Sequence, residues 1–388
     1  MNICIVAPNY PFKESMEYVF VKKLVDEWAR KGHHCVVVCE YSLSSYYRKR
    51  VPFRPRYYKE DVGDDQIVEV YHPRFLSSRI RIGKISLDDW IAEKVVTIQI
   101  RKLNLRFDFI YSHFFAPSFK VYRYARKNNI PLFVATGESG LASLFNKGLP
   151  FPSFKREEYK EFISGVISVS SKNMNEAIEQ GLIEKSKCQI FPNGTDQTCF
   201  KRLSKNVCRE ELNIPEDLFV VSCVGTICNR KGQDRILEAI RGIKRRTIKI
   251  LFLGQESKAE QVNIEGDEVL FKGTVNNKDL PKYLCASDIF CLPTLAEGCC
   301  NAIIEAMSCG LPIVSSDLPF NYDVLDNQNS ILVNPLDVEG IRNAILRLYE
   351  HPELRLEFSR VSLERSRSLS IEKRADSIMN FIKQRMKK

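Results

Sequence analysis

Residues 293–317 read PTLAEGCCNAIIEAMSCGLPIVSSD, and this stretch carries the most specific pattern in the chain. It contains a loop with a glycine, a helical pattern over 302–308, a Cys-Gly-Leu-Pro turn and an apolar strand over 313–315. Glu297 ends the loop and Glu305 lies eight residues later in the helix, a spacing of about 2.2 helical turns. The two carboxylates can therefore face one cleft, although two surface glutamates on an ordinary helix would show the same spacing.

The start of this helix is a candidate anion site. The backbone amides of Gly298, Cys299, Cys300 and Asn301 fall at its N-terminus, and Gly298 allows the backbone to approach a ligand closely. Free N–H groups and the helix dipole attract phosphate at such an end. Together with the two flanking carboxylates, this cradle suits a nucleoside diphosphate sugar.

The surrounding sequence alternates short apolar strands with amphipathic helices, in two similar series. Strands separated by helical patterns are typical of βαβ units and parallel sheets. The first series has expected strands at 3–7, 35–39, 109–112, 132–135 and 166–169. The second has expected strands at 219–224, 248–253, 269–271, 289–292 and 313–315. We therefore predict an α/β protein with two doubly wound, Rossmann-like parallel-sheet domains, an interdomain cleft and ligands at the carboxyl ends of the strands.

A second candidate phosphate site, VGTICNRKG, covers residues 224–232 between an expected strand and an expected helix. Lys231 and Arg230 can neutralise phosphate charge there, and Gly225 permits close approach of a ligand. A solvated dibasic turn is the alternative interpretation of the same residues.

The composition is that of a globular protein large enough for two domains, with 388 residues, 44% apolar and 27% charged. No apolar run approaches the roughly 18–20 residues of a membrane span, and the first residues lack a signal-peptide pattern, so we expect a cytoplasmic protein. The 13 cysteines form no CxxC pair and the five histidines are scattered. Buried reduced thiols and no metal site are therefore expected.

The net charge of +10 favours an anionic partner such as a nucleotide or a phospholipid surface. A nucleic acid is not expected, because no recognition motif is present. Basic and aromatic side chains gather in the first series, where they predict either peripheral contact with an anionic membrane or a solvated basic loop. They are Arg48, Lys49, Arg50, Phe53, Arg54, Arg56, Tyr57, Tyr58, Lys59, Arg74, Arg79, Arg81 and Lys84.

The stretch 293–317 resembles the retaining enzymes of glycosyltransferase family 4, which have the GT-B fold, because it matches their E-x7-E signature followed by EAM-x-CG-x-P. The similarity extends to MNICIVAPNYPFKESMEYVFVKKLVDEWARKGHHCVVV at the start, to ISVSSKNMNEAI at 167–178 and to IFPNGTDQTCF at 190–200. The resemblance implies that Glu297 binds hydroxyls of the donor sugar, that Glu305 binds the ribose and that Lys231 contacts the diphosphate.

Further donor contacts follow from the same resemblance. Gly254 matches a glycine-containing loop of the family, and the backbone near Val275 is expected to hold the base. Thr226 stands where many members have an arginine, and Arg230 is the expected substitute. Asp323 stands where members often have a glutamate at the start of a helix.

The N-terminal half departs more from the family pattern. The loop after the first strand, residues 8–17, has no glycine, whereas members often have a Gly-rich loop there. Glu138 stands near the place of a family histidine, where it could orient the acceptor hydroxyl or accept its proton. A surface loop is the alternative. His113 ends another strand and is either an acceptor contact or a structural histidine.

The expected organisation is an acceptor-binding domain over 1–195, a donor-binding domain over 196–370 and a last helix over 371–388 that packs back on the first domain, or else forms a free membrane-binding tail. The expected activity is retaining, metal-independent transfer from a UDP- or GDP-linked sugar to a saccharide or lipid-linked acceptor in surface polysaccharide biosynthesis. Glu138, Lys231 and Glu297 are the expected catalytic residues, and no cofactor is expected. A nucleotide-sugar-binding protein without transferase activity and a sugar-nucleotide epimerase remain alternatives.

Overall fold

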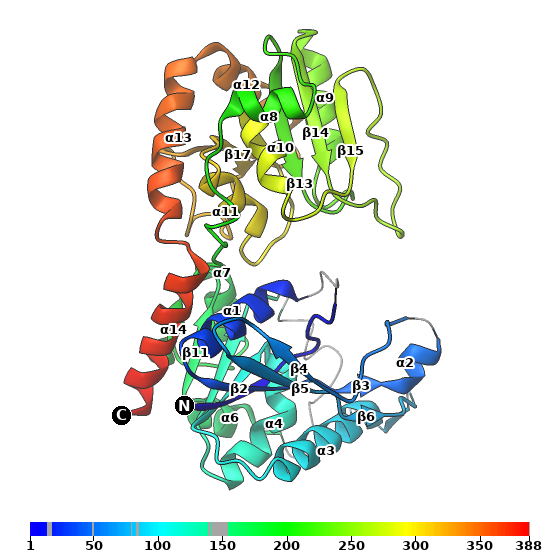
Figure 1. Ribbon diagram of the computed structural model, residues 1–388, viewed down its shortest axis with the longest axis vertical. Coiled ribbons are helices and arrows are strands. Elements are labelled where there is room, and N and C mark those ends of the chain that lie inside the picture. The colour runs from blue at the N-terminus through cyan, green and yellow to red at the C-terminus, as the bar shows by residue number, and fades with distance from the viewer. Residues whose placement is uncertain are drawn as a thin grey trace. The chain divides into compact units, whose positions relative to one another are not determined.

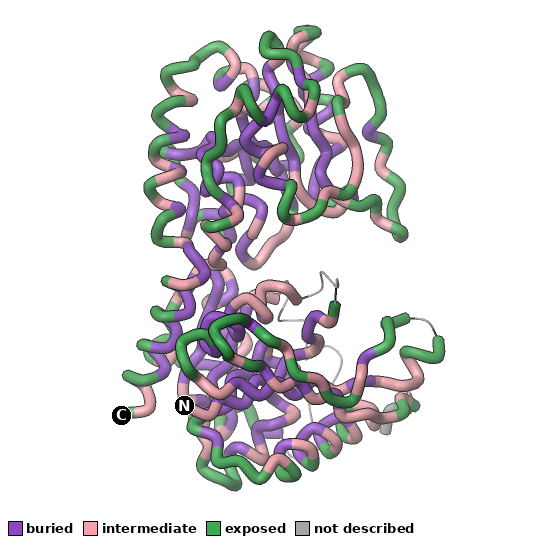
Figure 2. The backbone as a smooth tube through the Cα atoms, in the orientation of Figure 1, coloured by how far each residue is buried: buried purple, intermediate pink, exposed green. Residues whose placement is uncertain are grey.

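The chain divides into two compact units, and each is described by itself (Figure 1). The computed structural model describes residues 1–13, 18–48, 50–78, 80–82, 85–138, 141 and 154–387. Unit 1 comprises Met1–Phe191 with Arg374–Lys388, and unit 2 comprises Pro192–Lys373. Both are α/β, and Figure 2 shows that the strands at the centre of each unit are largely buried while turns and outer helix faces are exposed.

Unit 1 is built on an eight-stranded sheet in the order β12-β11-β10-β9-β1-β2-β5-β4. All neighbours are parallel except β4 and β5. The chain reverses its direction of progress across the sheet between β1 and β9, which makes this a doubly wound arrangement. The strands are β1 (Asn2–Val6), β2 (His34–Val38), β4 (Tyr57–Asp61), β5 (Ile67–Tyr71), β9 (Phe109–His113), β10 (Leu132–Thr136), β11 (Gly165–Ser168) and β12 (Cys188–Ile190).

Helices connect these strands, and two short ribbons complete the unit. The helices are α1 (Val19–Arg30), α2 (Leu43–Tyr47), α3 (Leu87–Lys102), α4 (Phe115–Lys127), α6 (Arg156–Phe162) and α7 (Ser171–Glu179), with a 3-10 turn η1 (Lys185–Lys187). The ribbons pair β3 (Tyr41–Ser42) with β6 (Arg74–Phe75), and β7 (Arg81–Ile82) with β8 (Ile85–Ser86).

Unit 2 has a six-stranded, wholly parallel sheet in the order β15-β14-β13-β16-β17-β18. The strands are β13 (Phe219–Val224), β14 (Ile248–Leu253), β15 (Val269–Gly273), β16 (Ile289–Leu292), β17 (Ile313–Ser316) and β18 (Ser330–Val333). From β13 the chain winds to one edge through β14 and β15, and then returns beside β13 as β16. The loops after β13 and β16 therefore meet at the reversal point, where sheets of this kind bind ligands.

The helices of unit 2 alternate with its strands. They are α8 (Lys205–Glu211), α9 (Gln233–Ile243), α10 (Leu280–Ala286), α11 (Asn301–Ser308), α12 (Val338–Glu350) and α13 (Pro352–Ser366). Asp323 lies in a series of turns over residues 319–324, and no helix begins there. In the described part of the chain, no helix is long and apolar enough to cross a membrane.

The basic and aromatic segment of unit 1 is only partly a solvated surface. Tyr47 and Phe53 are exposed, at 74% and 54%. Arg54 is buried instead, at 3% exposure, and its Nη1 donates to the carbonyl of Phe12. Arg54 therefore belongs neither to a solvated loop nor to a surface that could face a membrane. Lys49, Arg79, Lys84 and residues 14–17 of the first loop lie outside the described residues.

The last helix, α14 (Ile371–Met386), packs on unit 1 over most of its length. The indole Nε1 of Trp28 donates to the carbonyl of Ala375 at 3.1 Å. The ring of Phe381 packs on Gly165, where a Cβ atom would lie 2.9 Å from the ring, and its edge meets Phe133. Gly165 thus leaves the room that the aromatic ring occupies.

We expect Phe381→Ala to lower the stability of unit 1 by about 3 kcal/mol, because a buried aromatic side chain is replaced by a cavity. Trp28 and Trp90, the two tryptophans of the chain, both lie in unit 1, so tryptophan fluorescence during urea unfolding reports on that unit. The neighbouring Asn380 is exposed, and Asn380→Ala is the matched control. Equal midpoints for the two variants would contradict this account of how α14 is held.

Candidate functional site

The site in unit 2 is formed by two loops that follow adjacent parallel strands. The first, residues 225–232, follows β13, and the second, residues 293–300, follows β16. The loops are joined directly, since the amide of Leu295 donates to the carbonyl of Arg230 at 2.9 Å. The sequence-predicted phosphate site and the first glutamate of the E-x7-E pattern therefore lie side by side.

The carboxylate of Glu297 is the centre of this arrangement. Its Oε1 lies 2.7 Å from Lys231 Nζ and 2.7 Å from Arg230 Nη1. The hydroxyl of Thr294 donates to the same oxygen at 3.0 Å. Lys231 is 8% exposed, whereas Arg230 is exposed. One carboxylate thus neutralises a buried lysine and an exposed arginine at the carboxyl edge of the sheet.

The charges at this point shift the pKa values in opposite directions. Burial on its own raises the pKa of Glu297, but the charges and hydrogen bonds of Lys231 and Arg230 outweigh it and hold that pKa below its ordinary value. Burial on its own lowers the pKa of Lys231, but the neighbouring Cys300 and Glu297 raise it. Both groups are therefore charged at neutral pH.

Three glycines stand at the ends of three neighbouring strands of unit 2. Gly225 follows β13, Gly254 follows β14 and Gly273 ends β15. A Cβ atom on Gly254 would lie 2.1 Å from the carbonyl oxygen of Gly225, so no other residue fits at that position. Gly225 has φ +142°, and a Cβ there would lie 3.2 Å from the Lys231 side chain. The space that Gly225 and Gly254 leave is thus occupied by neighbouring groups of the protein, namely the Gly225 backbone and the Lys231 side chain.

Two side chains that the sequence analysis did not single out hold the first loop. Gln233 is 1% exposed, and its Nε2 donates to the carbonyl of Thr226 at 3.1 Å while its Oε1 accepts from the amide of Cys228. Arg235 donates to the carbonyls of Asn229 and Pro293, at 3.0 Å each. Arg235 therefore ties together the loops that carry Lys231 and Glu297. Both residues begin α9, and nothing in their spacing distinguishes them from ordinary helix surface.

The predicted anion cradle at the start of α11 has the geometry of a helix N-terminus. Cys300 is the N-cap residue in an extended conformation, and its side chain makes no capping hydrogen bond. Gly298 is half-buried and Cys299 is 9% exposed, with its carbonyl accepting from Asn193 Nδ2 at 3.0 Å. The buried Asn301 Oδ1 has no hydrogen-bond partner among the described residues, so one polar atom at this end of the helix is left unpartnered there.

The remaining donor-side residues lie at the same edge of unit 2. Glu305 is half-buried on α11, four residues after the helix begins. Val275 is half-buried two residues beyond β15, and Thr226 is half-buried directly after Gly225. The structure therefore brings the predicted donor contacts to the carboxyl ends of β13, β14, β15 and β16.

In unit 1, Glu138 caps a helix. Its Oε1 accepts from the amide of Phe115, the first residue of α4, at 2.9 Å. Its Oε2 accepts from the hydroxyl of Thr136 at 2.8 Å and from the amide of Gly137 at 3.0 Å. Burial raises the pKa of this carboxyl, although these donors oppose the shift. Both carboxylate oxygens of Glu138 are thus engaged by groups of the protein itself.

His113 lies at the end of β9 in aromatic surroundings. It is 4% exposed, and its ring contacts those of Phe20, Phe114 and Tyr111. Burial, with a smaller contribution from Arg374, lowers its pKa to about 3, so the imidazole is neutral. These contacts favour the structural alternative for His113.

Family models match both halves of the chain. The model described as Glycosyltransferase Family 4 matches residues 19–198, and the model described as Glycosyl transferases group 1 matches residues 219–351. Among curated relatives, TuaC of Bacillus subtilis (strain 168), named as a glycosyltransferase of teichuronic acid biosynthesis, is 25% identical over 91% of this chain and 90% of its own. The UDP-Gal:alpha-D-GlcNAc-diphosphoundecaprenol alpha-1,3-galactosyltransferase of Escherichia coli is 25% identical over 60% of this chain and 66% of its own.

Solved structures show the same fold. Sucrose-phosphate synthase from Thermosynechococcus elongatus superposes with a TM-score of 0.75 at 17% identity, over 99% of this chain and 98% of that one. Anabaena Alr3699/HepE in complex with UDP-glucose superposes with a TM-score of 0.70 at 16% identity, over 99% of this chain and all of that one. The chain is therefore a glycosyltransferase of the GT-B fold, in which a Glycosyltransferase Family 4 segment is followed by a Glycosyl transferases group 1 segment.

Proposed function

We propose that this enzyme transfers a sugar, with retention of anomeric configuration and without a metal ion, from a nucleoside diphosphate sugar bound by unit 2. The observation that carries the proposal is the pairing of Glu297 with Lys231 and Arg230 at the reversal point of the sheet, next to the N-terminus of α11. Two cations and a helix N-terminus at one point suit a diphosphate.

The ion pair gives the donor site two exchangeable states. Without donor, Glu297 neutralises Lys231 and Arg230, because a buried cation without a counter-charge is unstable. The donor diphosphate replaces the carboxylate on these cations. The released carboxylate can then accept hydrogen bonds from hydroxyls of the donor sugar, which is the role that the family resemblance gives it.

The rest of the donor is assigned to the neighbouring residues of unit 2. Glu305 binds the ribose hydroxyls, and the amides of residues 298–301 face the phosphates. The glycine-lined strand ends at Gly225 and Gly254 and the backbone near Val275 hold the base and its ribose. These residues share one edge of the sheet, which supports assigning them to a single elongated ligand.

The transfer reaction depends on stabilising the leaving group, which is the nucleoside diphosphate. As the bond to the sugar breaks, negative charge grows on the diphosphate, and Lys231, Arg230 and the α11 N-terminus stabilise that charge. These groups supply the positive charge that a metal ion provides in other enzymes. On the acceptor side, Glu138 holds the start of α4 and the end of β10 in place. We therefore assign Glu138 a positioning role rather than proton abstraction, and we assign His113 a structural role.

The acceptor is proposed from the relatives and from the charge of the chain. TuaC is named for teichuronic acid biosynthesis, and the acceptor of the Escherichia coli relative is a diphosphoundecaprenol-linked sugar. A saccharide or lipid-linked acceptor in bacterial polysaccharide biosynthesis fits both names. The exposed aromatic side chains Tyr47 and Phe53 and the net charge of +10 support peripheral contact with an anionic membrane.

The ion pair predicts a pH dependence of stability. Because the pKa of Glu297 is lowered in the folded protein, its stabilisation is present above the ordinary value of 4.5 and is lost as pH falls through the folded value. Glu297→Gln should therefore lower stability by about 2 kcal/mol near neutral pH, and the difference from the parent should shrink below pH 4.5. Unfolding followed by circular dichroism at several pH values measures this.

The exposed Glu265, paired with Lys272, provides the control for that experiment. Glu265→Gln should change stability little, because exposed ion pairs contribute little. A Glu297→Gln variant as stable as the parent at neutral pH would show that the pair does not hold the loops together.

Donor binding tests the proposal itself. One UDP- or GDP-linked sugar in a panel should raise the melting temperature of the enzyme by mass action. Lys231→Ala and Arg230→Ala should each weaken that binding about tenfold or more, since each removes a charge-assisted hydrogen bond. Arg246→Ala, at an exposed position before the amino end of β14, should leave it unchanged.

The same donor then serves in a transfer assay. Release of the nucleoside diphosphate should require an acceptor and proceed with chelator present, and NMR of the product should show the anomeric configuration of the donor. Absence of a thermal shift with every nucleotide sugar would refute the donor site, and an inverted product would refute the retaining mechanism.

A further inference from the structure

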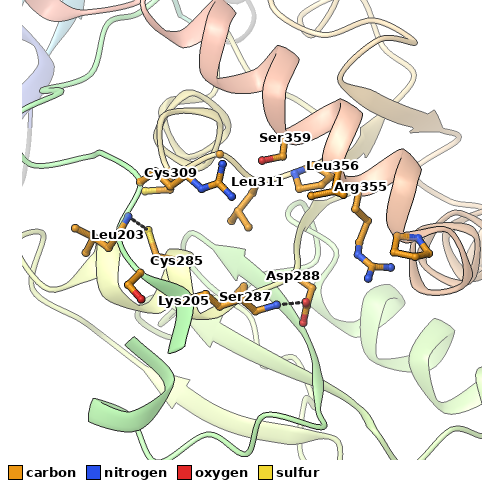
Figure 3. Close-up of a pocket in the computed structure, with 15 residues that line it drawn as sticks. Leu203, Lys205, Cys285, Ser287, Asp288, Cys309, Leu311, Arg355, Leu356 and Ser359 are labelled. Carbon is orange, nitrogen blue, oxygen red and sulfur yellow. Dashed lines mark hydrogen bonds and ion pairs between the residues drawn. The ribbon is translucent and has the colours of Figure 1, made fainter. Parts of the chain in front are cut away.

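A cavity of about 440 Å³ lies in unit 2 at the amino ends of β16 and β17, the edge of the sheet opposite to the donor loops. Ser287 and Asp288 precede β16, and residues 310–312 precede β17. Figure 3 shows the lining side chains around this space. Its volume suits a small molecule, and none of the residues assigned to the donor lines it.

Two thiols from different helices meet in this cavity. Cys285 lies in the last turn of α10, and Cys309 is the C-cap residue of α11. Both side chains line the cavity and are drawn close to one another in Figure 3, and each is the largest influence on the pKa of the other. None of the 13 cysteines of the chain, all of which are among the described residues, forms a disulfide bond. The pair is therefore a reduced dithiol that opens onto a cavity.

Cys285 lies among polar backbone groups and cationic side chains, and its Sγ donates to the carbonyl of Lys201 at 3.5 Å. Its Sγ accepts a hydrogen bond from the amide of Leu203 at 3.3 Å, and Arg202 and Lys205 also line the cavity. The neighbouring Cys309 lowers the pKa of Cys285, against the effect of burial, and the Leu203 amide and the charge of Arg202 lower it further. Cys285 and burial raise the pKa of Cys309.

The other thiols of the chain provide the contrast. Burial raises the pKa of Cys188 to about 12, and it raises the pKa of Cys291 as well. Reactive cysteines combine a lowered pKa with cationic surroundings and access for a reagent. Cys285 has the first two, and although it is only 6% exposed it lines the cavity, through which a molecule as small as peroxide can reach it. Within the described residues no group of three or more His, Cys, Asp or Glu side chains could hold a metal ion, so metal binding does not account for the pair.

We propose that Cys285 and Cys309 form a peroxide-reactive dithiol, in which Cys285 is the attacking thiol and Cys309 the resolving thiol. The Cys285 sulfur attacks the O–O bond of hydrogen peroxide, an S–O bond forms, and hydroxide leaves and takes up a proton as water. The Cys309 sulfur then attacks the sulfenic sulfur, the S–S bond forms, and the S–O bond breaks with release of a second water. The two thiols lose two electrons, and peroxide gains them.

The position of Cys309 connects this reaction to the donor site. Helix α11 begins at Asn301, beside the proposed phosphate cradle, and Cys309 follows its last residue. A helix of eight residues is about 12 Å long, so α11 is a short element that joins the two places. A disulfide between Cys309 and α10 therefore constrains the helix that carries Glu305. Lower donor affinity in the oxidised enzyme is expected, and this part of the inference rests on the proposed function.

Peptide mapping of the full chain tests the dithiol directly. The reduced protein is treated with hydrogen peroxide, the remaining thiols are blocked with N-ethylmaleimide, and disulfide-linked peptides are identified by mass spectrometry. A protease that cuts after glutamate is required, because Glu297 and Glu305 separate the two cysteines whereas no lysine or arginine lies between them. A Cys285–Cys309 link that dithiothreitol removes is the expected result.

Matched variants assign the roles of the two thiols. Cys285→Ser should abolish the peroxide reaction, and Cys309→Ser should stop at a sulfenic acid that a dimedone probe captures. Cys199→Ser, at a half-buried position in the same unit, should leave the link intact. The proposal is overturned if Cys188 or Cys199 is oxidised before any link between Cys285 and Cys309 forms.

Donor binding provides the second readout. Oxidation should remove the thermal shift given by the nucleotide sugar, dithiothreitol should restore it, and Cys285→Ser should keep it in peroxide. An unchanged shift in the linked protein would overturn the effect on the donor site. If the reduced protein binds no nucleotide sugar, the proposed function fails, while the linked peptide still decides the chemistry of the dithiol.

Discussion

The burial of Lys231 is the constraint on which the donor half of this enzyme depends. A lysine that is 8% exposed needs a partner for its charge, and Glu297 supplies it from the loop after the neighbouring strand. To bring the two groups within 2.7 Å, the loops after β13 and β16 must lie against each other. These loops are held in place by hydrogen bonds from Gln233 and Arg235 and by the close packing of Gly225 on Gly254.

The same constraint links fold to function. The reversal of strand order places β13 beside β16, and this alone brings two loops far apart in sequence together at one edge. In the free enzyme the cations are neutralised by a carboxylate that belongs to the protein. A diphosphate offers a stronger anion to the same groups, so we propose that donor binding exchanges one partner for another rather than exposing a new charge.

Much of this could be predicted from the sequence, because the determining signals are local. Apolar runs separated by helical patterns predicted the parallel sheets, and the E-x7-E stretch together with Arg230 and Lys231 predicted which loops hold charge. Contacts between distant segments could not be predicted. Whether Arg54 is exposed depends on where Phe12 lies, and the engagement of Glu138 depends on the start of α4 being beside the end of β10. The hydrogen bonds of Gln233 and Arg235 depend on the conformations of two loops, and no pattern in the sequence indicates those conformations.

A double-mutant cycle between Lys231 and Glu297 tests the central claim most directly. Stability is measured for the parent, Lys231→Met, Glu297→Gln and the double variant, first without ligand and then with saturating nucleoside diphosphate. We predict a coupling of about 1–3 kcal/mol in the free enzyme, falling toward zero when the diphosphate occupies the cations. A coupling near zero in the free enzyme, or one that the nucleotide leaves unchanged, would contradict the account.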